Sequence, residues 1–65
     1  MVTIHRLYKH KKSGNLYQVV DIAKFKDEDH WVKCIIYVSK LTGQNDVYVR
    51  RIEDFETKFE LYNGN

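Results

Sequence analysis

The sequence predicts an all-β fold of five short strands, and three observations lead to that prediction. Its 65 residues are 43% hydrophobic and 14% aromatic, and the apolar residues gather in short runs rich in β-branched and aromatic side chains. Polar and glycine-containing turns separate these runs. The clearest run, residues 31–40, has a period of two, which is typical of a strand with two different faces.

The first half of the chain contains two strands before this clearest run. An extended segment over residues 3–11 ends at the turn signal Lys-Ser-Gly-Asn of residues 12–15. Residues 16–26 follow as a long strand with many β-forming side chains. A polar break at residues 27–30 ends that strand.

The third strand, residues 31–40, predicts which side chains form the core. Its odd positions are chemically mixed, whereas its even positions are uniformly apolar. We therefore expect the even set to face the core. The set consists of Val32, Cys34, Ile36 and Val38.

The last elements are two short strands separated by a helical turn. Residues 46–51 alternate again, with Val47 and Val49 expected on the core side. A single helical or short 3₁₀ turn over residues 52–55 would bring Ile52 and Phe55 to one side, because residues three apart align. Residues 58–62 then form the last strand.

Five short strands with one helical turn before the last match a small SH3-like barrel, in which rolling the sheet protects its edges. We expect a single domain of this kind over residues 1–65, because the chain is too short for two. Cys34 has no disulfide partner and lies among apolar residues, so we expect a buried thiol in a cytoplasmic protein. No signal peptide or membrane-spanning run is expected.

Several short motifs resemble a family of small bacterial and phage proteins of unknown function. They are a Tyr-x-His-x-Lys segment from Tyr8, a Tyr-x-Val strand from Tyr17, a central Tyr37, an aromatic-Val-Arg segment from Tyr48, and a closing Phe55. The resemblance covers residues 6–56 and implies a compact SH3-like barrel. This chain departs from the family at position 51, where an arginine replaces the common proline.

The residue types do not favour an enzyme, a cofactor or a metal site. A nucleophile needs an adjacent base and an orienting group, and neither serine lies in such a motif. His5 and His10 are expected on opposite strand faces, and the Asp27, Asp29 and His30 group is typical of a solvated turn.

A surface strip is the main candidate for function. If the even set is core, the outward side chains combine aromatic rings with cations, a mixture typical of binding hot spots. Alternatively, Tyr37 and Tyr48 pack in a second small core that Trp31 also covers. Arg50 either binds an anion or pairs with Glu53 or Asp54, and His10 either anchors the first turn or lines an anion site.

We therefore predict a non-catalytic binding module that engages a protein partner or its own copy. The alternative is binding of nucleic acid or a phosphorylated nucleotide, as a phage-encoded inhibitor or sequestering protein would do. The net charge of +2 is low for a nucleic-acid binder, although the first twenty residues hold four basic residues and no acid. The predicted binding residues are His10, Tyr17, Lys33, Tyr37, Tyr48 and Arg50.

Overall fold

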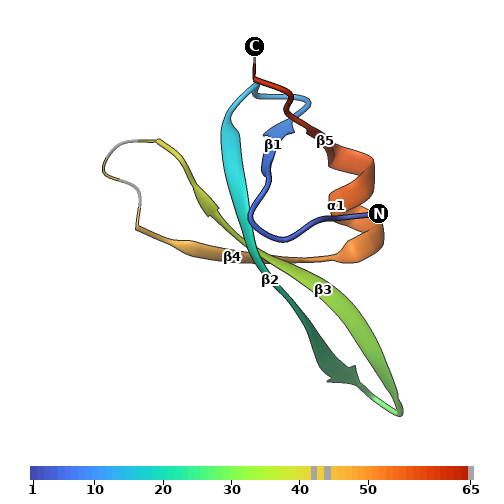
Figure 1. The fold of residues 1–65 in the computed structure, drawn as a ribbon. Helices are drawn as coiled ribbons and strands as arrows, with labels where there is room; N and C mark the ends of the chain where they lie inside the picture. The colour runs from blue at the N-terminus through green and yellow to red at the C-terminus, as the bar shows by residue number, and fades with distance from the viewer. Residues whose placement is uncertain (42, 44, 65) are drawn as a thin grey trace.

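The computed structural model describes residues 1–41, 43 and 45–64, and within them it contains five strands and one short helix (Figure 1). The predicted five-stranded β architecture is therefore confirmed. No described helix is long and apolar enough to cross a membrane. The elements are β1 (Leu7–His10), β2 (Leu16–Asp27), β3 (His30–Ser39), β4 (Val47–Arg51), α1 (Ile52–Lys58) and β5 (Phe59–Leu61).

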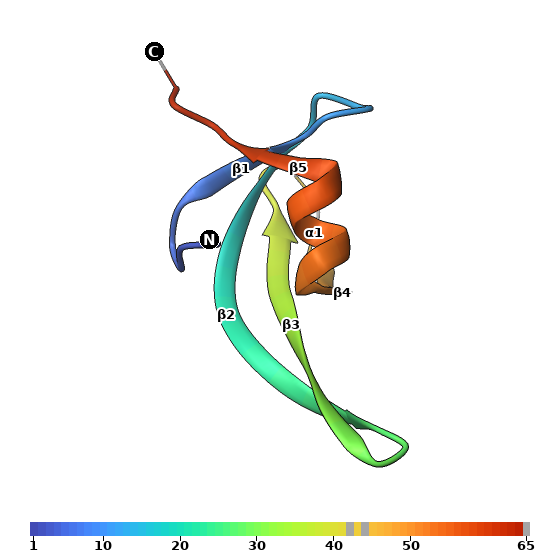
Figure 2. The same ribbon diagram turned by 90° about the vertical axis from the view of Figure 1, so that its right-hand side faces the viewer.

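All five strands belong to one antiparallel sheet with the order β4-β3-β2-β1-β5. The sheet is not closed into a barrel, so β4 and β5 are its edges. β2 and β3 form a long hairpin whose distal part extends away from the other elements as an arm (Figures 1 and 2). Its tip is a two-residue turn in which Glu28 has a positive φ of 54°, a conformation that costs energy for a residue with a Cβ.

Strand pairing assigns each side chain of β2, β3 and β4 to one of two faces, because directly paired residues point the same way. A bulge between Val19 and Asp21 shifts the register of β2 and preserves this assignment on both sides. One face, here called the inner face, contains Tyr17, Val19, Ile22, Ile35, Tyr37, Tyr48 and Arg50. The opposite, outer face contains Asp21, Ala23, Phe25, Val32, Cys34, Ile36, Val38, Val47, Val49 and Arg51.

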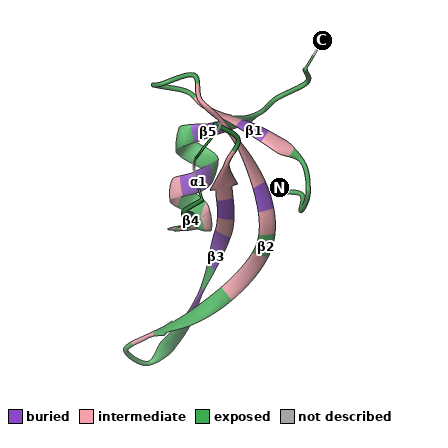
Figure 3. Ribbon diagram, turned by 90° about the vertical axis from the view of Figure 1, so that its left-hand side faces the viewer, coloured by how far each residue is buried: buried purple, intermediate pink, exposed green. Residues whose placement is uncertain are grey.

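The core lies against the inner face and is largely aromatic. α1 covers this face through Phe55, which stacks on Phe59 with ring centroids 4.2 Å apart and contacts Tyr37 edge-on at 5.2 Å. Figure 3 shows buried residues on the sheet and on α1. The buried cluster consists of Val2, Tyr8, Val19, Ile35, Tyr37, Phe55 and Phe59.

The prediction that the even positions of β3 face the core is wrong, although Val32 is buried on the outer face. The period of two is correct, but Ile35 and Tyr37 are buried in the core while Val47 and Val49 are 65% and 61% exposed. The inner face packs against Phe55 of α1 and Phe59 of β5, and Tyr37 contacts both of these aromatic rings edge-on. Cys34 is buried as predicted, but on the outer face, where its Sγ donates to the carbonyl oxygen of Ala23.

Two smaller predictions also need correction. The segment before β5 is a seven-residue α-helix, longer than the single helical or 3₁₀ turn expected, and Ile52 and Phe55 both pack against the core as predicted. Glu53 and Asp54 in its first turn and Lys58 in its last turn suit the helix dipole. Trp31 covers no second core, because it is 63% exposed on the hairpin arm.

Candidate functional site

Five of the six residues predicted to bind a partner come together on the inner face. His10, Tyr17, Tyr37, Tyr48 and Arg50 line one open hollow of about 280 Å³, here called the tyrosine hollow. Ser13, Asn15 and Phe59 complete its wall.

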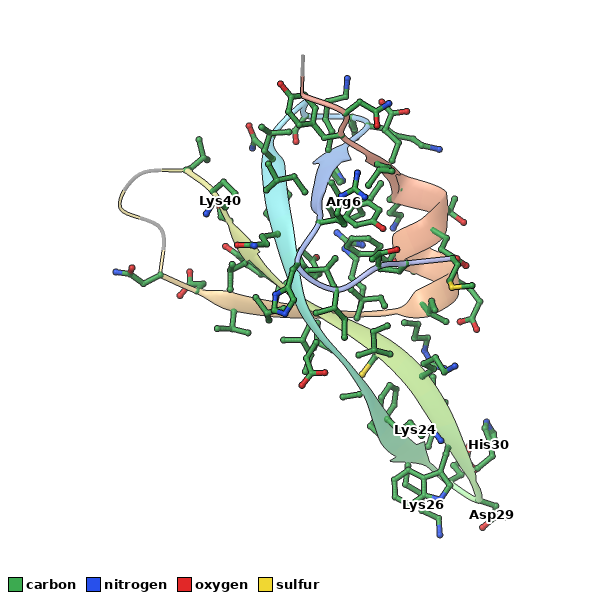
Figure 4. All side chains as sticks on the ribbon, in the orientation of Figure 1. Arg6, Lys24, Lys26, Asp29, His30 and Lys40 are labelled. Carbon is green, nitrogen blue, oxygen red and sulfur yellow. The ribbon has the colours of Figure 1, made fainter. Side chains whose placement is uncertain are left out.

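The sixth predicted residue, Lys33, does not belong to this group. It pairs with Lys24 across the hairpin arm, where Figure 4 labels Lys24 and Lys26. Lys33 shares a face of β3 with Tyr37 as predicted, but it does not line the tyrosine hollow, because the arm carries this part of β3 away from it.

The tyrosines form a packed layer rather than the outward strip expected from the sequence. Tyr37 and Tyr48 stack with centroids 5.5 Å apart, and Tyr17 contacts them edge-on at 5.4 and 6.2 Å. Tyr37 is 4% exposed, whereas Tyr17 and Tyr48 are half-buried. Only Tyr17 and Tyr48 therefore offer ring surface to a ligand, on a base that Tyr37 and Phe59 hold in place.

Arg50 is fixed in the wall by contacts on two sides. Its Nε donates to the Tyr37 hydroxyl at 2.8 Å, and its Nη1 donates to Asp54 Oδ2 at 2.6 Å. Its guanidinium also lies 5.5 Å from the centroid of the Phe59 ring. The pairing of Arg50 with Asp54, one of the two roles expected for this residue, is confirmed.

Asp54 forms ion pairs with two cations, and these contacts shift the pKa values of Asp54 and Arg50. Lys58 Nζ lies 3.0 Å from Asp54 Oδ1. Hydrogen bonds from Arg50 and then from Lys58 lower the pKa of Asp54 below its ordinary value, and the Asp54 contact raises the pKa of Arg50. Burial raises the pKa of Tyr37, although the Arg50 hydrogen bond opposes this. At neutral pH, Asp54 is therefore negatively charged, Arg50 is positively charged and the Tyr37 hydroxyl is uncharged.

His10 anchors the turn between β1 and β2, which is one of the two roles expected for it. Its Nδ1 lies 3.0 Å from Ser13 Oγ and accepts the Ser13 backbone N–H at 3.3 Å, while Asn15 N–H donates to the same hydroxyl. Gly14 closes this turn with a φ of 80°, which favours glycine. The imidazole also packs edge-on against Phe59, so it lies at the rim of the tyrosine hollow.

A second hollow of about 340 Å³, here called the cationic hollow, adjoins the first. Its lining includes His10 and Arg50, the two residues that it shares with the tyrosine hollow. We call the two together the cleft. The remaining lining residues are Lys11, Lys12, Thr57 and Lys58.

Sequence reasoning missed Thr57 and Lys58 as part of this site. They are brought to the β1–β2 turn because the N–H of Lys11 donates to the carbonyl oxygen of Lys58 at 2.9 Å, a contact between segments distant in the sequence. No local pattern signals it.

The positive charge of the cationic hollow is only partly balanced. Asp54 neutralises one equivalent of the charge on Arg50 and Lys58. Neither Lys11 nor Lys12 forms an ion pair with any described residue. This part of the cleft therefore attracts anions.

No cluster of three or more potential metal ligands occurs among the described residues. No protein-family model, curated protein or solved structure matches the chain.

Proposed function

We propose that this chain is a non-catalytic binding module whose cleft takes an acidic segment of a protein partner. The observation that carries the proposal is the shared wall of the two hollows, in which His10 and Arg50 separate tyrosine rings from lysines. An apolar side chain would pack on the exposed ring surface of Tyr17 and Tyr48, and neighbouring carboxylates would meet Lys11 and Lys12.

The rigid construction of the cleft supports this proposal. Arg50 and Tyr37 are held by hydrogen bonds of 2.6 and 2.8 Å, so little side-chain entropy is lost when a partner binds. The half-buried rings of Tyr17 and Tyr48 add contact surface with few rotatable bonds. Lys11 and Lys12 supply long-range attraction for an acidic chain.

Nucleic acid is the second candidate ligand, favoured by the same grouping of cations and tyrosines. Two observations weigh against it. Tyr37 is too buried to stack on a base, and two of the cations, Arg50 and Lys58, already share Asp54.

We further propose that this fold is related to the SH3-like barrels. We also propose that the chain is related to the family of small bacterial and phage proteins that its motifs resemble. The strand order β4-β3-β2-β1-β5 and the short helix before β5 support this assignment. A reducing compartment such as the cytoplasm is proposed because Cys34 is a buried free thiol.

The proposed function is tested by selecting peptides from a random library on the immobilised protein and measuring the affinity of the best synthetic peptide. We expect enrichment of sequences that combine Asp or Glu with an apolar or aromatic residue. The double variant Lys11→Glu/Lys12→Glu should weaken binding by at least about tenfold, since each reversed charge replaces attraction by repulsion.

The matched control is Lys24→Glu/Lys26→Glu, which makes the same charge change on the hairpin arm (Figure 4). It should leave the affinity within about twofold if the cleft is the site. Equal losses of peptide affinity in the two double variants would contradict the proposal. Binding of single-stranded oligonucleotides with a steep salt dependence, and no acidic peptides, would favour the second candidate instead.

A further inference from the structure

The outer face of the sheet carries an apolar surface that no described element covers. α1 and the residues of the buried cluster all pack on the inner face. On the outer face, Val47 and Val49 are 65% and 61% exposed and Phe25 is 39% exposed. Ile36 and Val38 lie between them on β3 and are half-buried. We call these five residues the aliphatic face.

This apolar surface is continuous across neighbouring strands. Val49 pairs with Ile36 and Val47 pairs with Val38, so four β-branched side chains form a block over β4 and β3. A hollow of about 420 Å³ extends the block toward Phe25 and Cys34. A contiguous apolar patch on a small protein is typical of an interaction site.

Charged residues on the two margins of the aliphatic face make it complementary to itself. Arg51 lies on the β4 margin and Asp21 lies on the β2 margin, in adjacent rows of the sheet. If two copies pack face to face around a two-fold axis parallel to the strands, the β4 margin of one copy lies over the β2 margin of the other. Arg51 of each copy then faces Asp21 of its partner.

Both margin residues are available for this contact. Asp21 is exposed and forms no ion pair with a described residue; its Oδ1 accepts only the N–H of Ile22. Arg51 donates from Nη2 to Asp27 and lies over the Phe25 ring, yet its guanidinium carries further N–H donors.

We propose that the aliphatic face is the interface of a symmetric homodimer, in which the sheets of two copies pack face to face and Arg51 pairs with Asp21 across the two-fold axis. This goes beyond the proposed function, because the cleft opens on the inner face and stays free in the dimer. Three strands over about seven residues span roughly 14 Å by 20 Å, an area smaller than a standard interface, so we expect a weak, reversible dimer with a dissociation constant in the micromolar range.

Analytical ultracentrifugation of the full chain from about 5 to about 500 µM tests this proposal, because a micromolar dimer changes its populations over that range. We expect a reversible shift from monomer to dimer. Val49→Lys should weaken association at least about tenfold, since it places a charge in the apolar block. Its folding should be preserved because Val49 is 61% exposed. Trp31→Lys, at a 63% exposed position on the opposite face, is the matched control and should dimerise like the unchanged chain.

A charge exchange tests the geometry. Asp21→Arg and Arg51→Asp should each weaken the dimer, and the double variant should restore it because the opposite charges meet again. A sharp monomer at the highest concentration would overturn self-association and leave the aliphatic face to a different protein. Normal dimerisation of Val49→Lys, or loss of the dimer in Trp31→Lys, would overturn this choice of interface. Failure of the Asp21→Arg/Arg51→Asp double variant to dimerise would overturn the two-fold arrangement.

Discussion

Two neighbouring isoleucines on β3 provide a direct test of which face of the sheet is the core. Ile35 is 0% exposed on the inner face, and Ile36 is half-buried on the outer face. Ile35→Val and Ile36→Val remove the same methylene group from adjacent positions. The two variants therefore differ only in the surroundings of the missing atoms.

The expected effects follow from burial. A fully buried methylene contributes about 0.8 kcal/mol, and the space left behind raises the cost of Ile35→Val to about 1 kcal/mol. Ile36→Val should cost less than about 0.5 kcal/mol in the monomer, since its side chain is partly hydrated in both states. A chain of this length has a total stability of roughly 3–10 kcal/mol, so both variants should remain folded.

Urea denaturation monitored by circular dichroism measures this difference. With an m value near 1 kcal/mol/M, Ile35→Val should lower the midpoint by about 1 M and Ile36→Val by less than about 0.5 M. The protein should be kept at low micromolar concentration so that association does not stabilise Ile36. A larger loss for Ile36→Val than for Ile35→Val would refute the assignment of faces.

Three further predictions concern the turn and the Arg50 group. Glu28→Gly should raise the free energy of unfolding by up to about 1 kcal/mol in urea denaturation, because Glu28 has a positive φ; a loss of stability would contradict this turn geometry. Tyr37→Phe should cost about 1 kcal/mol in the same assay by removing the acceptor of the Arg50 Nε hydrogen, and no change would show that this bond contributes nothing. Because the pKa of Asp54 is lower in the folded chain, its contribution to stability is present above its ordinary pKa of 3.8 and is lost as the pH falls through the folded pKa. Stability measured from pH 6 to pH 2 should therefore fall less steeply in Asp54→Asn, and parallel curves for the two proteins would contradict the sign of this shift.

Local patterns predicted the elements well and the orientation of the sheet poorly. The helical turn that aligns Ile52 with Phe55, and the pairing of Arg50 with Asp54 four residues later, depend on short sequence separations. A period of two shows that Val47 and Val49 share a face, but it does not say which face meets α1. Their hydrophobicity favoured the core, whereas the core uses tyrosines whose hydroxyls reach polar partners at its rim, as Tyr37 does with Arg50.

The candidate site was predictable only where it depends on strand pairing. Tyr17, Tyr37 and Tyr48 lie on strands that pair directly, so their proximity follows from the strand order. Thr57 and Lys58 could not be identified, because their position depends on how α1 and β5 return to the β1–β2 turn. Lys33 was predicted on the correct face of β3 but grouped with the site, because the sequence does not reveal where the arm leaves the body of the sheet.

The central claim is that the molecule has two separate surfaces, the cleft on the inner face and the aliphatic face on the outer one. A ¹⁵N heteronuclear NMR titration tests it most directly, using the best selected peptide in one series and protein dilution in another. We predict that the peptide shifts the signals of His10, Lys11 and Tyr48, and that dilution shifts those of Val47 and Val49. Shifts of one common set of residues in both series would contradict the two-surface account.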